Sequence, residues 1–216
     1  FVVPIISLYL LWHRKDILPA SAPSSYFMGG LCFLVAALIR GAAIVLQYPL
    51  MEGASLIPCL AGVAFMVGGW PYLRWSWPSI VFLAFAIPLP GALATRMAGP
   101  LQRIATTGST YTLQTLGISA ASSGNVILLS NGQVGIAEAC NGLRMLIAFL
   151  AIAFAITVLL RIPIWERAFL MASGVVVAIT CNIIRISATG VVYDRISPEL
   201  ADRVFHDFAG FIMMPI

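Results

Sequence analysis

The chain has 216 residues, of which 61% are hydrophobic and only 9% are charged. Soluble domains carry roughly 45–50% apolar and about 25% charged residues, so this composition excludes a water-soluble globule and a disordered chain. The net charge of +4 comes from scattered Lys and Arg without a basic cluster, which argues against a nucleic-acid partner. The class of protein that remains is an integral membrane protein whose spans are helices.

The predicted fold is an all-α polytopic membrane protein, a multispan helical bundle that forms a single integral membrane domain over residues 1–216. A membrane helix needs about 20 mostly apolar residues. Because the chain opens on Phe1 and stops at Ile216, both inside apolar runs, we expect a fragment trimmed at both ends. The seven predicted spans, two of them partial, are 1–12, 26–47, 54–70, 75–90, 141–160, 166–192 and a last one that begins near residue 204.

A more polar stretch, residues 91–139, separates the fourth and fifth predicted spans. Between Leu93 and Leu116 the apolar residues recur at helical spacing opposite a polar face, which is typical of an amphipathic helix on the membrane surface. Two β-prone runs then flank Asn131-Gly132, a strong hairpin signal because both turn positions need positive φ. The stretch therefore predicts a surface helix and a small β-hairpin on the outer face.

The short loops predict the orientation of these spans. If the loop with Arg14 and Lys15 is cytoplasmic, alternation places the loops with Arg74 and with residues 161–167 on the same side. These three loops hold five Lys/Arg against two acidic residues, so the positive-inside rule favours this orientation. Residues 91–139 then lie outside the cytoplasm.

Ionisable residues at membrane spans are costly and mark functional sites by default. Three regions of this kind, 138–144, 182–185 and 206–207, come to the outer face in the predicted topology. Cys140 is predicted at a helix N-terminus, where the backbone dipole favours a thiolate and lowers the thiol pKa. Arg144 follows Cys140 at i+4 and is expected to share its face.

The other two regions complete a predicted catalytic set. The Arg185 guanidinium suits a developing oxyanion, and Asn182 shares its helix face at i and i+3. The chain has two histidines, and His13 falls on the cytoplasmic side. If Cys140 has an imidazole partner acting as general acid and base, only His206 can supply it.

Less specific interpretations of the same residues stay open. Cys140 alone fits plain packing, as Cys32, Cys59 and Cys181 do within apolar runs. Arginine and histidine side chains also anchor spans at the interface. A second interpretation of Asp207 is a charged loop residue exposed to solvent. A zinc site is a poor fit because there is no CxxC and the two histidines lie on opposite sides. A transporter, or another non-catalytic component such as one for polysaccharide export, is the competing class of function.

Four sequence motifs in order resemble the exosortase/archaeosortase family, from about Phe82 to the end of the chain. The nucleophile motif is usually Glu-Ala-Cys-Ser-Gly-Leu-Arg; here Asn141 stands where Ser is more common. An Asn still fits a helix cap, whereas a role for a hydroxyl there is in doubt. The four stretches are 85–90 with 101–102, 138–144 (EACNGLR), 182–185 (NIIR) and 206–210 (HDFAG).

The resemblance implies a membrane-embedded cysteine transpeptidase of the inner (plasma) membrane, with its active site on the extracytoplasmic face, that needs no cofactor or metal. Its substrates are exported proteins whose C-terminal sorting signal contains a short motif, a transmembrane helix and a basic tail. Its other partners are membrane lipids and a cell-envelope acceptor, such as a polysaccharide or a lipid, and water as acceptor would make the protein a hydrolase. The implied roles are nucleophile and thioester for Cys140, oxyanion stabiliser for Arg185 and general acid/base for His206, with Glu138, Asn141, Arg144, Asn182 and Asp207 as secondary or substrate-binding candidates.

Overall fold

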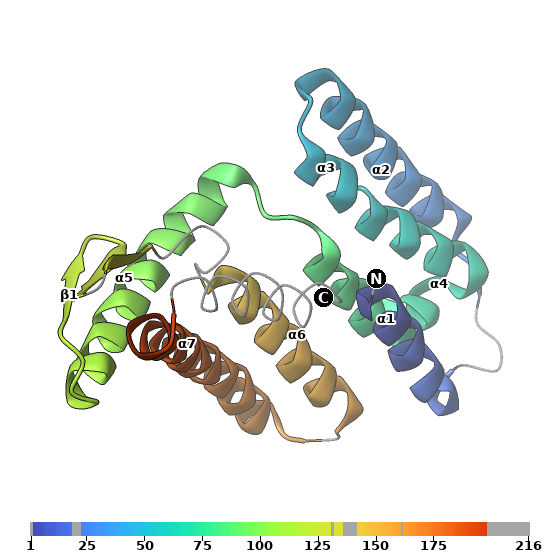
Figure 1. Ribbon diagram of the computed structural model, residues 1–216. Helices are drawn as coiled ribbons and strands as arrows, with labels where there is room; N and C mark the ends of the chain where they lie inside the picture. The colour runs from blue at the N-terminus through green and yellow to red at the C-terminus, as the bar shows by residue number, and fades with distance from the viewer. Residues whose placement is uncertain (1, 19–22, 131, 136–141, 161, 198–216) are drawn as a thin grey trace. The chain divides into compact units, whose positions relative to one another are not determined.

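A computed structural model describes residues 2–18, 23–130, 132–135, 142–160 and 162–197, and helices dominate these ranges (Figure 1). Short 3₁₀ turns, η1 and η2, follow α1 and α4. The elements are α1 (Val2–His13), η1 (Lys15–Ile17), α2 (Tyr26–Leu46), α3 (Pro49–Ala54), α4 (Leu56–Phe82), η2 (Leu83–Ala86), α5 (Gly91–Thr115), β1 (Ala120–Ser123), β2 (Val126–Leu129), β3 (Gly132–Gly135), α6 (Leu143–Leu159) and α7 (Ile164–Arg195).

Three helical segments of the described chain are long and apolar enough to cross a membrane. They are Tyr26–Leu46, Pro49–Ala86 and Ile164–Arg195, and two shorter apolar helices, α1 and α6, accompany them. Large apolar side chains cover their outer surfaces; Phe27 on α2 and Ile164 on α7 are about four-fifths exposed. Surfaces of this kind suit lipid rather than water, so the chain is a helical membrane protein.

The chain divides into two compact units. The first contains the described residues of Phe1–Pro90 and of Phe154–Ile162, and the second contains those of Gly91–Ala153 and those from Pro163 onward. The polar stretch predicted from residue 91 therefore begins where the second unit begins.

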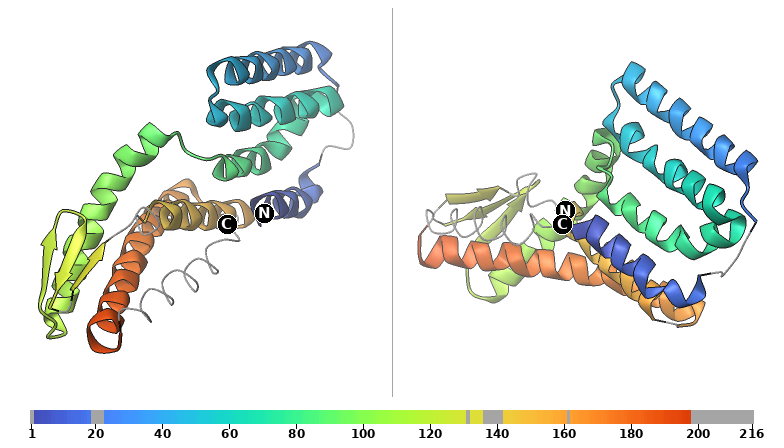
Figure 2. Two further views of the ribbon diagram at one scale, coloured as in Figure 1. Left: turned by 45° about the horizontal axis from the view of Figure 1, so that its top comes forward. Right: turned by 90° about the vertical axis from the view of Figure 1, so that its right-hand side faces the viewer.

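In the first unit, α2 lies alongside α4 in both views of Figure 2. Glycine lets the two backbones approach, because a Cβ at Gly62 would lie 3.2 Å from the carbonyl oxygen of Gly29 and 3.3 Å from the Cβ of Cys32. Small residues at a helix crossing are the usual device for packing helices in lipid. Elsewhere in the unit, the rings of Phe82, Phe85 and Phe154 pack together with centroids 5.8–6.3 Å apart.

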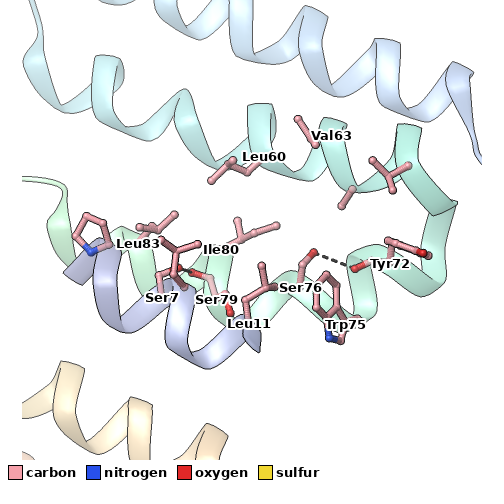
Figure 3. Close-up of a pocket in the computed structure, with 14 residues that line it drawn as sticks. Ser7, Leu11, Leu60, Val63, Tyr72, Trp75, Ser76, Ser79, Ile80 and Leu83 are labelled. Carbon is pink, nitrogen blue, oxygen red and sulfur yellow. Dashed lines mark hydrogen bonds between the residues drawn. The ribbon is translucent and has the colours of Figure 1, made fainter. Parts of the chain in front are cut away.

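Helix α4 is broken at Gly68 and Gly69, whose φ/ψ angles are non-helical. Gly69 has φ +62°, and a Cβ there would collide with the carbonyl oxygen of Pro23. Pro71 falls in the first turn after the break, where its missing N–H costs no hydrogen bond. The two halves double back on each other in Figure 3.

The break corrects two predicted boundaries. The sequence predicted spans over 54–70 and 75–90 with a loop around Arg74, because a charge was taken as the end of a span. The chain instead turns at Gly68-Gly69, and Arg74 lies inside the second half of α4. The helical run of the first half also begins earlier than predicted, with α3 at Pro49.

The two halves of α4, together with α1 and η2, enclose an apolar cavity of about 370 Å³ (Figure 3). Ser7 of α1 closes one side by donating a hydrogen bond from Oγ to the carbonyl oxygen of Ser79 at 2.9 Å. At one end, Trp75 Nε1 donates to the carbonyl oxygen of Arg14 at 2.8 Å. None of the predicted site residues lines this cavity.

In the second unit, α5 packs along α7 through small residues. A Cβ at Gly190 would lie 2.8 Å from Leu113 Cδ1, and Leu113 is fully buried. Ser109 Oγ donates to the carbonyl oxygen of Ile183 at 3.2 Å. The predicted amphipathic helix over 93–116 is confirmed as α5, whose buried face includes Ala105, Leu113 and several hydroxyl side chains.

A three-stranded antiparallel sheet of order β1-β2-β3 follows α5. Ile127 and Leu129 of β2 point into a core shared with Ile118 and Ile186. The predicted hairpin is confirmed as β2–β3, but its register pairs Leu129 with Gly132. The two connecting positions are therefore 130 and 131, one residue earlier than predicted, and Gly132 is the first residue of β3.

Strand β1 was not predicted, because Ala-Ala-Ser-Ser lacks the β-branched and aromatic residues that favour strands. It pairs with β2 from Ala120↔Leu129 to Ser123↔Val126. The connection has Gly124 at φ +62° in its first position, which is the position where a type II′ turn requires glycine.

Six of the seven predicted spans correspond to helical segments of the described chain. Those over 1–12, 26–47 and 166–192 match α1, α2 and α7, and the third and fourth match the two halves of α4 with shifted ends. The span predicted over 141–160 is the 17-residue α6. The seventh, from residue 204, lies outside the described residues, so the described chain does not show seven spans.

Candidate active site around Asn182 and Arg185

The site is built on α7, which carries both residues of the predicted Asn-x-x-Arg motif. Asn182 is 3% exposed, in the buried stripe of α7 that also holds Ala178 and Ile186. Arg185 Nη2 donates a hydrogen bond to Asn182 Oδ1 at 2.7 Å. The predicted shared face at i and i+3 is confirmed, and the bond is of the strong charge-assisted class.

Asn182 lies where three helices of the second unit meet. The meeting point encloses a cavity of about 10 Å³, close to the least volume that holds one water molecule. Small side chains bring the helices together here, so the carboxamide has little room to turn. The lining residues are Leu101 and Ala105 of α5, Gly142 and Leu146 at the start of α6, and Ala178, Ile179 and Asn182 of α7.

Gly142, the residue directly before α6, lies against Asn182. Its φ is +72°, and a Cβ there would lie 2.8 Å from Asn182 Nδ2. Its carbonyl oxygen accepts a hydrogen bond from the Leu146 N–H at 2.9 Å, the first turn of α6. The backbone therefore needs glycine at this position for both its conformation and its contact.

Arg144 lies in the first turn of α6, which begins at Leu143 directly after Gly142 with its positive φ. Cys140 is outside the described residues, so the predicted i, i+4 relation between Cys140 and Arg144 stays a prediction. Arg144 itself is exposed on the first turn of α6.

The remaining predicted site residues lie outside the described residues, so their convergence with Arg185 stays a prediction. They are Glu138, Cys140, Asn141, His206 and Asp207.

Cys32, Cys59 and Cys181 are half-buried free thiols on α2, α4 and α7. This placement agrees with their interpretation as small packing residues. Within the described ranges, no group of three or more His, Cys, Asp or Glu side chains gathers as metal ligands would.

Sequence reasoning did not single out Gly142 as a functional residue. A signal was present, because Asn141-Gly142 is an Asn-Gly dipeptide, which marks turns with positive φ. Its meaning was hidden by the prediction of a span that starts at residue 141.

Comparison with known families gives a match over the whole chain. The model of the transmembrane exosortase family matches residues 1–216. The comparisons with curated proteins and with solved structures find no match. The chain belongs to the transmembrane exosortase family, whose members are membrane peptidases or transpeptidases of sorting signals.

Proposed function

From this membership in the transmembrane exosortase family, we propose that the chain is a cysteine transpeptidase of the inner membrane with its active site on the extracytoplasmic face. It cleaves the C-terminal sorting signal of exported proteins and transfers the new C-terminus to a cell-envelope acceptor. The substrate's transmembrane helix docks laterally against the bundle, because its cleavage site must reach the membrane surface.

The reaction proceeds in two balanced steps. The Cys140 thiolate attacks the scissile carbonyl, and the C–N bond breaks as His206 gives a proton to the leaving amine. The acyl group is then held on sulfur as a thioester. His206 next takes the proton of the acceptor nucleophile, which attacks the thioester and releases the thiolate. Arg185 stabilises the oxyanion of both tetrahedral intermediates.

One structural observation supports the proposal most directly. Arg185 is hydrogen-bonded to a buried asparagine whose amide lies against Gly142, two residues after Cys140 in the sequence. Arg185 Nη2 donates to Asn182 Oδ1 at 2.7 Å, and a guanidinium oriented in this way suits an oxyanion site, where donors must be in place before the charge develops. An interface anchor would instead extend toward the lipid headgroups.

Co-expression with a substrate that carries a short motif, a transmembrane helix and a basic tail tests the proposal. Cys140→Ala is expected to abolish processing, and Cys181→Ala, the matched control at a packing cysteine, is expected to retain it. Full processing by Cys140→Ala would exclude the mechanism and favour a non-catalytic role. Mass analysis of the product's new C-terminus separates transfer to an acceptor from hydrolysis by water.

A further inference from the structure

Asn182 has a feature that packing alone does not explain. A carboxamide that is 97% buried on an apolar helix is costly unless its polar atoms are paired. Its Oδ1 accepts from Arg185 and its Nδ2 faces the Gly142 backbone. The oxygen of this amide therefore contacts Arg185, and its nitrogen lies beside Gly142.

The surroundings fix the orientation of that amide. Ala105 and Ala178 line the small cavity beside it, and both are less than a tenth exposed. The space beside the amide is about 10 Å³, room for about one water molecule. The packing of α5, α6 and α7 holds the side chain in place, and the hydrogen bond from Arg185 favours Oδ1 over Nδ2 on the side of the guanidinium.

The hydrogen bond from Nη2 to Asn182 Oδ1 orients Arg185. A guanidinium carries five N–H donors in a rigid fork, so fixing one of them fixes the plane of all five. A long side chain without such a bond samples many rotamers, and ordering it at each turnover costs free energy.

We propose that Asn182 is a positioning residue for the reaction. It holds the Arg185 guanidinium in a fixed place relative to Gly142, which follows Cys140 by two residues in the sequence. This inference rests on the proposed function, because it assigns Asn182 to the oxyanion-stabilising step of that reaction.

A double-mutant cycle on the full chain with the co-expressed substrate tests this role. Asn182→Ala is expected to lower kcat by about 10- to 100-fold, the effect of a misplaced catalytic group, with KM nearly unchanged. The double variant Asn182→Ala/Arg185→Ala is expected to be no slower than Arg185→Ala alone, since Asn182 acts through Arg185. Losses that multiply in the double variant would overturn the inference.

Two further variants guard against a folding defect. Asn182→Asp keeps the shape and an acceptor oxygen for Arg185, so it is expected to retain kcat within a few-fold of the parent and to exceed Asn182→Ala. A kcat for Asn182→Asp as low as that of Arg185→Ala would contradict the positioning role. Ser187→Ala is the matched control, because Ser187 is buried on the same helix and its Oγ has no partner among the described residues; it is expected to leave kcat unchanged.

The failure of this inference differs from the failure of the proposed function. If Cys140→Ala stays active, the proposed function is wrong whatever the cycle gives. If Cys140→Ala is inactive while the Asn182 and Arg185 losses multiply, the transpeptidase proposal stands and only the positioning role is wrong.

Discussion

Gly142 lies against Asn182 so closely that a methyl group on Gly142 would approach Asn182 Nδ2 to 2.8 Å. The contact joins the start of α6 to the buried stripe of α7. A side chain at position 142 is therefore opposed both by the positive φ of the backbone and by the contact with Asn182.

Gly142→Ala is expected to lower both the stability of the protein and its rate of processing. Gly117→Ala is the control that separates backbone strain from the contact with Asn182. Both glycines have similar positive φ, +72° and +78°, but a Cβ at Gly117 meets nothing within 4 Å. The backbone strain of either alanine is about 1 kcal/mol. Thermal unfolding in detergent and processing rates are the measurements. We expect Gly142→Ala to cost more than Gly117→Ala in both, and equal effects would mean that the contact with Asn182 is unimportant.

Gly190→Ala is expected to overpack the crossing of α5 and α7. The new methyl would lie 2.8 Å from Leu113 Cδ1 and 3.0 Å from Cδ2, and overpacking of this kind costs about 1–3 kcal/mol. Leu113→Val shortens the partner, so the double variant should lose less stability than the sum of the single variants. Gly99→Ala is the control, because it lies in α5 with open space around its Cβ. Purely additive losses would argue against the close contact.

Ser7 and Ser79 form a matched pair for a stability test. Ser7→Ala removes the hydrogen bond to the Ser79 carbonyl oxygen, which in membrane proteins costs about 0.6 kcal/mol. Ser79→Ala removes a hydroxyl that has no partner among the described residues, so it should be neutral or stabilising. Chemical or thermal unfolding compares the two variants in the same detergent. The assignment is wrong if Ser79→Ala is the more costly change.

Thiol labelling tests the predicted state of Cys140. A membrane-impermeant reagent applied to intact cells is expected to label Cys140 before Cys32, Cys59 and Cys181. Because only the thiolate reacts, a pKa below the usual value of about 8.5 shifts the midpoint of the labelling rate to lower pH. The rate should rise with pH and reach its plateau earlier than that of a free thiol. A Cys140→Ser variant, which should lose the early labelled product, identifies the reacting residue; a midpoint at or above 8.5 contradicts the helix N-terminus argument.

The sequence predicted best those features that depend on local periodicity. The amphipathic helix agrees with α5 to within two residues at each end, and Asn182 and Arg185 meet at 2.7 Å because helix geometry brings i and i+3 together. The family resemblance also emerged from short motifs and is confirmed over the whole chain.

The features that the sequence did not predict depend on contacts between distant segments. The break in α4 falls at Gly69 because the Pro23 carbonyl oxygen occupies the space of a side chain there, which no local pattern reveals. Strand β1 consists of residues with low strand propensity, and it forms because it pairs with the edge of β2. The start of α6 falls at Leu143 rather than 141 because Gly142, whose φ is positive, precedes the helix.

The reversal of α4 has a consequence for counting sides of the membrane. A helix of 27 residues would be about 40 Å long if straight, enough to carry the chain from one face of a bilayer to the other. Because it turns back at Gly68-Gly69, we expect the chain to leave this hairpin on the membrane face where it entered. Pro49 and Pro90 are then expected on the same side of the membrane, and charges in the two flanking loops in the same compartment.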